Sequence, residues 1–179
     1  LPVCLYLFER QKKVCTSENE SIYMIHAVSA LTHAHVRSQM ACGIYYFLVK
    51  AILEEEGSLE KRLQKGMERA YQYYRQNLSN HRELENYKRL ADLSEFKETP
   101  KEGIKSSGYV VDTLEAAVWC LLHSHSYKET VLMAVNLGED TDTIGAVAGG
   151  LAGLYYKEEG IPQEWTQVLQ RREWIEEVL

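Results

Sequence analysis

Apolar residues recur at intervals of three and four along almost the entire chain, the spacing that places them on one face of an α-helix. Sustained alternation of apolar and polar residues, which would indicate a half-buried strand, does not occur. The sequence therefore predicts an all-α protein of about eight helices. The expected helices cover residues 1–9, 17–30, 36–56, 58–76, 109–124, 127–136, 143–158 and 161–179. The helical pattern after 58–76 continues at 83–91.

The least helical part of the pattern lies at residues 93–107, where Pro100, Gly103 and a pair of serines interrupt it. We expect a loop here, and long loops within compact domains are often functional. At 179 residues the chain has the length of one domain with a sizeable core, so we expect residues 1–179 to form a single all-α domain.

Composition and charge exclude several classes of function. The formal net charge of −6 argues against broad electrostatic binding to nucleic acid or to an anionic membrane. No apolar run in the sequence approaches the roughly 18 residues of a membrane span. The four cysteines lack CxxC spacing, so we expect reduced core cysteines and a cytoplasmic protein.

The stretch 138-GEDTDTIGAVAGGLAGLYY-156 combines acidic residues with many glycines. Gly145, Gly149 and Gly153 are spaced by four and would share one face of a helix. Each glycine inside a helix costs about 1 kcal/mol relative to alanine, so with Gly150 the run costs on the order of 4 kcal/mol. We expect the close approach of a neighbouring backbone to offset this cost. The helix should then be central, with its beginning rigidly held.

Asp140, Asp142 and Thr143 stand at the beginning of that helix. One interpretation is capping, because Asp and Thr at a helix N-terminus accept free backbone N–H groups and favour the positive end of the dipole. The other is a metal site. Two carboxylates about 6 Å apart repel by roughly 3 kcal/mol at an effective dielectric constant of 20, and a divalent cation removes that repulsion. Carboxylate and hydroxyl oxygens suit Mg²⁺, with water, substrate or another acidic segment completing the shell.

The histidines give a weaker signal. His33 and His35 lie two residues apart, as do His123 and His125, and side chains at this spacing diverge on a helix, so we expect neither pair to chelate Zn²⁺. A histidine at a break between helices can instead hydrogen-bond a ligand hydroxyl or satisfy a local contact. The sequence shows no defensible Ser-His-Asp arrangement and no phosphate-binding glycine loop, so we assign no catalytic residue beyond the metal ligands.

These motifs resemble those of the ADP-ribosylglycohydrolase family. The run NLGEDTDTIGAVAGGLAGLYY is similar to the acidic motif of the family and is the most specific match. The resemblance covers most of the chain and is thin only over 58–105. The supporting segments, in the order of the family, are LPVCLYLF, 30-ALTHAHVRSQMACGIYYFLVKAIL-53, 108-GYVVDTLEAAVWCLL-122 and the tail residues Ile161, Pro162 and Trp165.

The resemblance implies a compact orthogonal multi-helix bundle and an enzyme that hydrolyses the glycosidic bond between ADP-ribose and a protein side chain or small acceptor. Family members use two Mg²⁺ ions, or in some cases Mn²⁺. The implied partner is an ADP-ribosylated protein or a small molecule that contains ADP-ribose. The implied site residues are the metal ligands Asp140, Asp142 and Thr143 and the substrate-binding residues His33, Gly108 and Tyr109.

The chain departs from the family pattern in two ways. Glu139 stands where a glycine usually precedes the first Asp, and we give it no catalytic role. A Thr-Asp-Asp-type motif and a Gly-Asp-x-x-Gly segment, which supply the other metal ligands in the family, are absent from the sequence. We therefore expect the chain to be the C-terminal part of a larger domain, completed by a preceding N-terminal segment and weak or inactive alone.

Two other interpretations stay open. One is a non-catalytic relative, such as a crystallin-like or ADP-ribose-binding structural protein, and the other is a structural α-domain whose acids are helix caps. The retained Asp-x-Asp-Thr set favours the hydrolase, because a protein relieved of catalysis has no need to keep the repulsion between its carboxylates.

Overall fold

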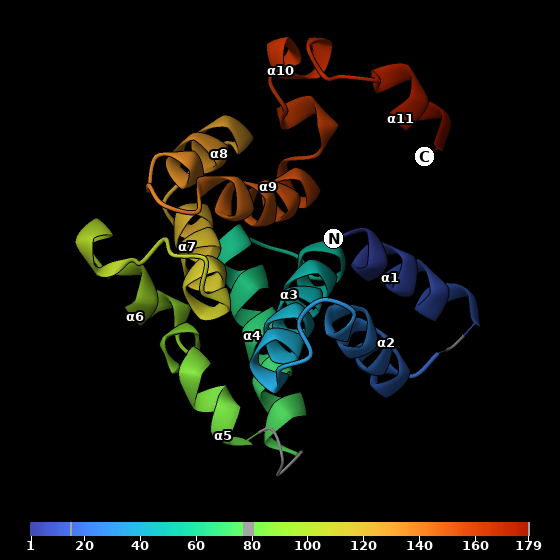
Figure 1. The fold of residues 1–179 in the computed structure, drawn as a ribbon, viewed down its shortest axis with the longest axis vertical. Coiled ribbons are helices and arrows are strands. Elements are labelled where there is room, and N and C mark those ends of the chain that lie inside the picture. The colour runs from blue at the N-terminus through green and yellow to red at the C-terminus, as the bar shows by residue number, and fades with distance from the viewer. Residues whose placement is uncertain (15, 77–80, 179) are drawn as a thin grey trace.

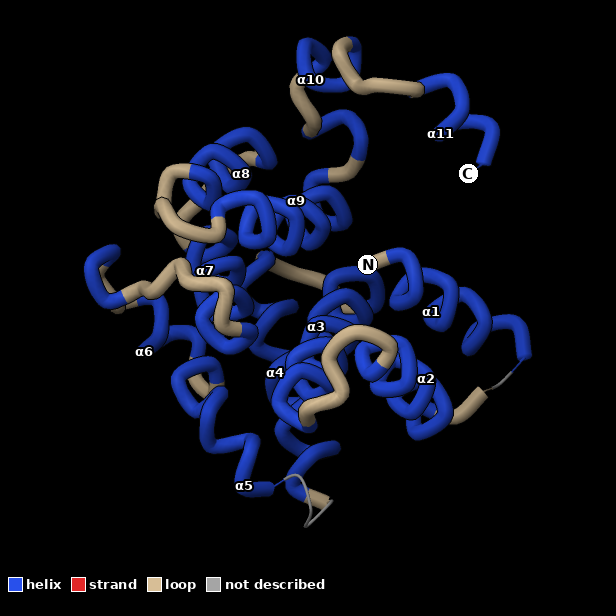
Figure 2. The backbone as a smooth tube through the Cα atoms, in the orientation of Figure 1, coloured by secondary structure: helices blue, strands red, loops and turns tan. Residues whose placement is uncertain are grey.

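All regular structure in the computed structural model is helical within the residues that it describes, 1–14, 16–76 and 81–178 (Figure 2). The all-α prediction is confirmed. In the same residues, no helix combines the length and the apolarity needed to cross a bilayer. The α-helices are α1 (Pro2–Val14), α2 (Glu18–Ala30), α3 (Val36–Glu54), α4 (Leu59–Arg75), α5 (His81–Leu84), α6 (Leu93–Lys97), α7 (Val110–Leu122), α8 (Tyr127–Val135), α9 (Thr141–Tyr156), α10 (Gln163–Gln167) and α11 (Arg172–Val178). The 3-10 helices are η1 (Glu85–Leu90), η2 (Lys101–Gly103) and η3 (Glu158–Gly160).

The described residues form eleven α-helices rather than about eight, and the difference arises mainly in two places. The loop expected at 93–107 instead contains α6 and η2. Asp92 begins α6 because its carboxylate accepts two first-turn N–H groups, which makes it a strong N-cap. The single helix expected from 161 to 179 is divided into α10 and α11, with Arg171 between them at a φ of 57°.

Helix α3 lies at the centre of the molecule. It packs against α1, α2, α4, α7 and α9, and Figure 1 shows α1 and α2 on one side of it and α7, α8 and α9 on another. A helix covered on several sides needs apolar residues around most of its circumference rather than along one stripe. The α3 sequence meets this need with Met40, Ala41, Ile44, Tyr46, Phe47, Leu48, Val49, Ala51 and Ile52, all of which are buried.

Serine caps fix where three of the helices begin. Ser17 forms a capping box with Glu20: its hydroxyl accepts the Glu20 N–H at 3.2 Å, and the Glu20 carboxylate accepts the Ser17 N–H at 2.9 Å. Ser58 and Ser126 each accept one first-turn N–H, of α4 and α8 respectively. The helix starts expected near Ser17 and Ser58 are confirmed.

The glycine face of α9 packs against side chains rather than against a backbone. At Gly145, Gly149 and Gly153 an added Cβ would meet side-chain atoms of α8 at 3.1–3.7 Å. The expected backbone approach is therefore wrong for these three glycines, although the central position of α9, against α3, α7 and α8, is confirmed. Backbone does approach closely at Gly66 in α4, where an added Cβ would lie 2.9 Å from the Phe47 carbonyl oxygen of α3.

Two of the cysteines lie in the core as expected, and a third does not. Cys4 and Cys120 are free and buried, and burial raises the pKa of their thiols to about 11 and about 12, so both stay protonated at neutral pH. The expectation is wrong for Cys42, which is exposed because it lines a cleft between helices. Cys15 lies outside the described residues.

Replacing Gly66 by alanine should destabilise the protein by about 1–3 kcal/mol, because the added methyl group overlaps the α3 backbone, which cannot rotate aside as a side chain can. Gly153→Ala is the matched control. Its Cβ would meet only Tyr127 Cε2, at an ordinary contact distance of 3.7 Å. The higher helix propensity of alanine should therefore raise the free energy of unfolding by up to about 1 kcal/mol. Urea unfolding followed by circular dichroism measures both free energies. Equal values for the two variants would contradict the described contact between α3 and α4.

Candidate functional site

The loop before α7 brings together residues that are far apart in the sequence. The Ser106 carbonyl accepts the Asp140 N–H at 3.0 Å, which ties this loop to the beginning of α9. Gly108 lies against the Asp140 carboxylate, since an added Cβ would be 3.3 Å from Oδ2. Tyr109 then accepts a hydrogen bond from Arg37 in the first turn of α3. The beginnings of α3, α7 and α9 therefore meet around Gly108 and Tyr109.

Asp140 occupies the N-cap position of α9 but does not cap the helix with its side chain. Its φ of −86° and ψ of 60° lie outside the extended conformation of a capping residue. Its carboxylate accepts no hydrogen bond from the first-turn N–H groups of α9, all of which belong to described residues. Oδ1 instead accepts the Thr143 hydroxyl at 2.8 Å. The capping interpretation is therefore wrong for Asp140.

The turn ahead of Asp140 contains two residues in the left-handed region of backbone conformation. Gly138 has a φ of 98° and Glu139 a φ of 53°. Glycine adopts such angles freely, whereas a residue with a Cβ loses roughly 1 kcal/mol. Glu139 stands where the family motif usually has glycine, and the positive φ is a physical reason for that preference.

The oxygen donors at the beginning of α9 fit part of a Mg²⁺ shell. Asp140 is half-buried, while Asp142 and Thr143 are exposed. Because the Thr143 hydroxyl donates its hydrogen to Asp140, the lone pairs of its oxygen remain available to a cation. Three donors do not fill an octahedral shell. Among the described residues, no group of three or more His, Cys, Asp or Glu side chains could hold a metal ion by itself.

His33 lies in the linker between α2 and α3, and its hydrogen bonds are local. Its backbone N–H donates to the Ser29 carbonyl at 2.8 Å, and its Nδ1 lies 3.0 Å from the Thr32 hydroxyl oxygen. The residue is exposed, so its ring is accessible to a ligand. His35 has a different place: its Nδ1 accepts the Arg37 N–H at 3.1 Å and caps α3. Each of the two exposed rings uses its Nδ1 in one local contact, so these contacts alone do not distinguish His33 from His35 as a ligand-binding residue.

A largely apolar cleft of about 470 Å³ lies beside these residues. It is bordered by α1, α2, α3, α7 and α9. Its lining includes four residues that lie within a few positions of a predicted site residue: Thr32 precedes His33, Val110 follows Tyr109, and Ala146 and Val147 follow Thr143. None of the six predicted site residues lines this cleft itself, although segments that contain them border it. Their roles stay predictions.

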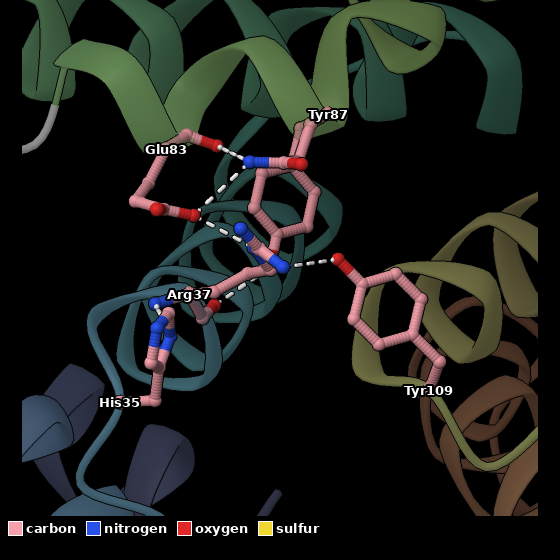
Figure 3. Close-up of polar contacts among 6 residues, drawn as sticks. His35, Arg37, Glu83, Tyr87 and Tyr109 are labelled. Atoms are coloured by element: carbon pink, nitrogen blue, oxygen red, sulfur yellow. Dashed lines mark hydrogen bonds and ion pairs between the residues drawn. The ribbon is translucent and has the colours of Figure 1, made fainter.

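Arg37 is a polar residue of this site that no motif predicts. Its Nη1 donates to the Tyr109 hydroxyl oxygen at 2.7 Å, and its Nε donates to a Glu83 carboxylate oxygen at 2.6 Å (Figure 3). The hydrogen bond to Glu83 raises the pKa of the guanidinium above its ordinary value. The two partners lie 46 and 72 residues away in the sequence, so local spacing holds no signal of these contacts.

Because the Asp140 side chain does not cap α9, Asp140→Ala should lower the free energy of unfolding by less than about 0.5 kcal/mol. Ser17→Ala, which removes the capping box of α2, is the comparison and should cost about 1 kcal/mol. Thermal unfolding followed by circular dichroism measures both. A loss at Asp140 as large as the loss at Ser17 would restore the capping interpretation.

Comparison with known proteins agrees with the motifs. The sequence profile of the family described as ADP-ribosylglycohydrolase matches residues 2–179. The chain is 44% identical over 78 residues to the ADP-ribosylarginine hydrolase Tri1 of Pseudomonas putida (strain GB-1), a stretch that covers 44% of this chain and 21% of that protein. It is 41% identical over 86 residues to the ADP-ribosylarginine hydrolase Tri1 of Serratia proteamaculans (strain 568), covering 48% of this chain and 24% of that protein. The matched part thus spans about a quarter or less of these relatives.

The fold also has a close counterpart among solved structures. A chain of an ADP-ribosylglycohydrolase-related protein complex superposes with a TM-score of 0.70 and 27% sequence identity, over 89% of this chain and 51% of that chain. The predicted type of helical bundle is confirmed. Since the family profile matches residues 2–179 and the solved fold agrees, the chain belongs to the ADP-ribosylglycohydrolase family.

Proposed function

We propose that the chain supplies one side of the active site of a Mg²⁺-dependent hydrolase, which cleaves the glycosidic bond between ADP-ribose and a modified protein side chain or small acceptor. The observation that carries the proposal is the placement of the Asp140 carboxylate. It does not cap α9, it accepts the Thr143 hydroxyl, and it lies against Gly108 near an apolar cleft. Family membership supports the reaction class.

Asp140, Asp142 and Thr143 would contribute two carboxylates and a hydroxyl to the metal site. Bound Mg²⁺ would polarise the scissile bond or lower the pKa of the attacking water. The remaining ligands, for two ions in the complete site, would come from a segment of the protein outside these 179 residues. Mn²⁺ takes the same oxygen donors, so this donor set suits either ion.

The residues near the cleft would bind the ADP-ribose portion of the substrate. Gly108 has no side chain, so a ligand can approach its backbone closely, as the Asp140 carboxylate does. Tyr109 is 41% exposed and accepts a hydrogen bond from Arg37, which leaves its own hydroxyl hydrogen free to donate. The exposed His33 ring would hydrogen-bond a ribose hydroxyl. Because the two compared relatives are ADP-ribosylarginine hydrolases, arginine-linked ADP-ribose is the first substrate to test.

The charge of the chain favours a compact ligand held by local contacts. ADP-ribose carries a diphosphate, and the chain carries a formal charge of −6, so overall attraction cannot drive binding. Metal ions held by Asp140 and Asp142 would offset this repulsion locally, over a distance that suits a small ligand and not a long nucleic acid. We place the reaction in the cytoplasm, where free thiols such as the buried Cys4 and Cys120 are typical.

In the complete protein, Asp142→Ala should abolish the release of ADP-ribose from an ADP-ribosylated arginine substrate, because it removes a carboxylate from the metal site. Helicity should stay nearly unchanged, since Asp142 is exposed in the first turn of α9. Glu139→Gln removes a neighbouring acid without an assigned role and should keep near wild-type turnover. Chromatography of released ADP-ribose, in Mg²⁺ and in EDTA, measures the reaction. Undiminished turnover by Asp142→Ala would overturn the metal assignment.

The isolated 179-residue chain should bind Mg²⁺ weakly, because two carboxylates and one hydroxyl leave much of the shell to water. Calorimetric titration should show saturable binding only in the complete protein, and tight binding by the isolated chain would mean that no further ligands are needed. ADP-ribose and Mg²⁺ together should also raise the Tm of the complete protein. No shift would favour a non-catalytic relative instead.

A further inference from the structure

Arg37 links three parts of the chain beside the proposed site (Figure 3). Its guanidinium joins Glu83 of α5 to Tyr109 at the beginning of α7, with donor–acceptor distances of 2.6 and 2.7 Å. Glu83 is itself held, because its carboxylate also accepts the Asn86 side-chain amide at 3.0 Å. The guanidinium therefore lies between an anchored carboxylate and a phenol.

The backbone of Arg37 is fixed as well. The hydroxyl of Tyr87, whose side chain is buried, donates to the Arg37 carbonyl at 2.7 Å. The His35 ring accepts the Arg37 N–H at 3.1 Å. Because the arginine is held at its backbone and by Glu83, it is the rigid partner in its contact with Tyr109, and the exposed phenol is the partner that is positioned.

The backbone that carries the positioned phenol is tied to one of the proposed metal ligands. Tyr109 follows Gly108, which lies against Asp140, and its N–H donates to the Ser107 hydroxyl oxygen at 3.2 Å. The ring is 41% exposed, and the Arg37 guanidinium lies 5.7 Å from its centroid. An exposed tyrosine otherwise samples several staggered rotamers, and a hydrogen bond from a charged donor selects one of them.

The contacts within the protein weaken a direct role of Arg37 in binding an anion. The carboxylate of Glu83 offsets its charge, and two of its five N–H donors point at Glu83 and Tyr109. Its effect on a ligand is therefore expected to pass through Tyr109.

We propose that Arg37 is a positioning residue, which fixes the Tyr109 phenol in the orientation that contacts the ADP-ribose portion of the substrate, with Glu83 as its brace. This role rests on the proposed function and adds how the substrate side of the cleft is ordered. Ordering the phenol before the ligand arrives removes an entropic cost from binding. Because Tyr109 is assigned to binding, the effect falls on substrate affinity rather than on the chemical step.

Steady-state hydrolysis by the complete protein, together with calorimetric binding of ADP-ribose, tests this role. Arg37→Gln should raise KM and the Kd for ADP-ribose about tenfold, as expected for the loss of one charge-assisted hydrogen bond, while kcat changes less than about twofold. In a Tyr109→Phe background, Arg37→Gln should add nothing, because the contact that it breaks is already gone.

Arg89→Gln is the control for the loss of an arginine that only stabilises the fold. Arg89 donates to the buried Glu115 and so fastens η1 to α7. Its loss should lower the Tm without raising KM. If Arg37→Gln does not fold, Glu83→Gln replaces it: loosening the brace should raise KM in the same direction by a smaller factor.

The outcomes separate this role from the proposed function. A KM of Arg37→Gln equal to that of the wild type, or an increase that persists in the Tyr109→Phe background, overturns the role of Arg37 and leaves the proposed function standing. A wild-type protein that neither binds nor releases ADP-ribose overturns the proposed function and this role with it.

Discussion

Burial of α3 by helices on several of its sides is the constraint on which the rest of the structure depends. Phe47, Leu48 and Val49 are fully buried, although consecutive residues of a helix point about 100° apart, so these sides need different covering helices. Burying one such side chain contributes about 1.5–3 kcal/mol, and no neighbour can therefore separate from α3 at low cost. The beginning of α3 becomes a fixed point as a result, and His35 and Arg37 stand there.

From this fixed point, the loop before α7 assembles the site. Ser106 binds the backbone of Asp140, and three residues later Tyr109 binds the side chain of Arg37. The same short segment thus contacts the acidic end of the site and its substrate side. Because four consecutive residues make both contacts, a displacement of the loop would change the two sides together. Under the proposed function, metal binding and substrate affinity would be coupled through this loop, without any need for a moving domain.

The sequence alone predicted those parts of the fold that depend on interactions between residues close together in the chain. The capping box at Ser17 and the apolar period of the long helices involve residues within a few positions of each other. It was insufficient for α6, which is too short to show a period and is set by the Asp92 cap. The contact of Arg37 with Tyr109 spans 72 positions and leaves no local pattern. At Asp140 the sequence left two interpretations open, because caps and metal ligands use the same residue types. The backbone angles and the lack of a hydrogen bond to the first turn of α9 reject the cap.

The left-handed backbone at Glu139 determines how much freedom the chain retains just ahead of Asp140. A glycine there would relieve the strain of the folded turn, but it would widen the range of conformations open to the unfolded chain, and folding would lose more entropy. Glutamate strains the folded turn but restricts the unfolded chain, and these two effects on the free energy of folding are of similar size. The net stability of the turn therefore changes little, while its backbone becomes stiffer. A narrower set of accessible angles holds the Asp140 carboxylate more firmly, which would suit the metal ligand proposed at this position.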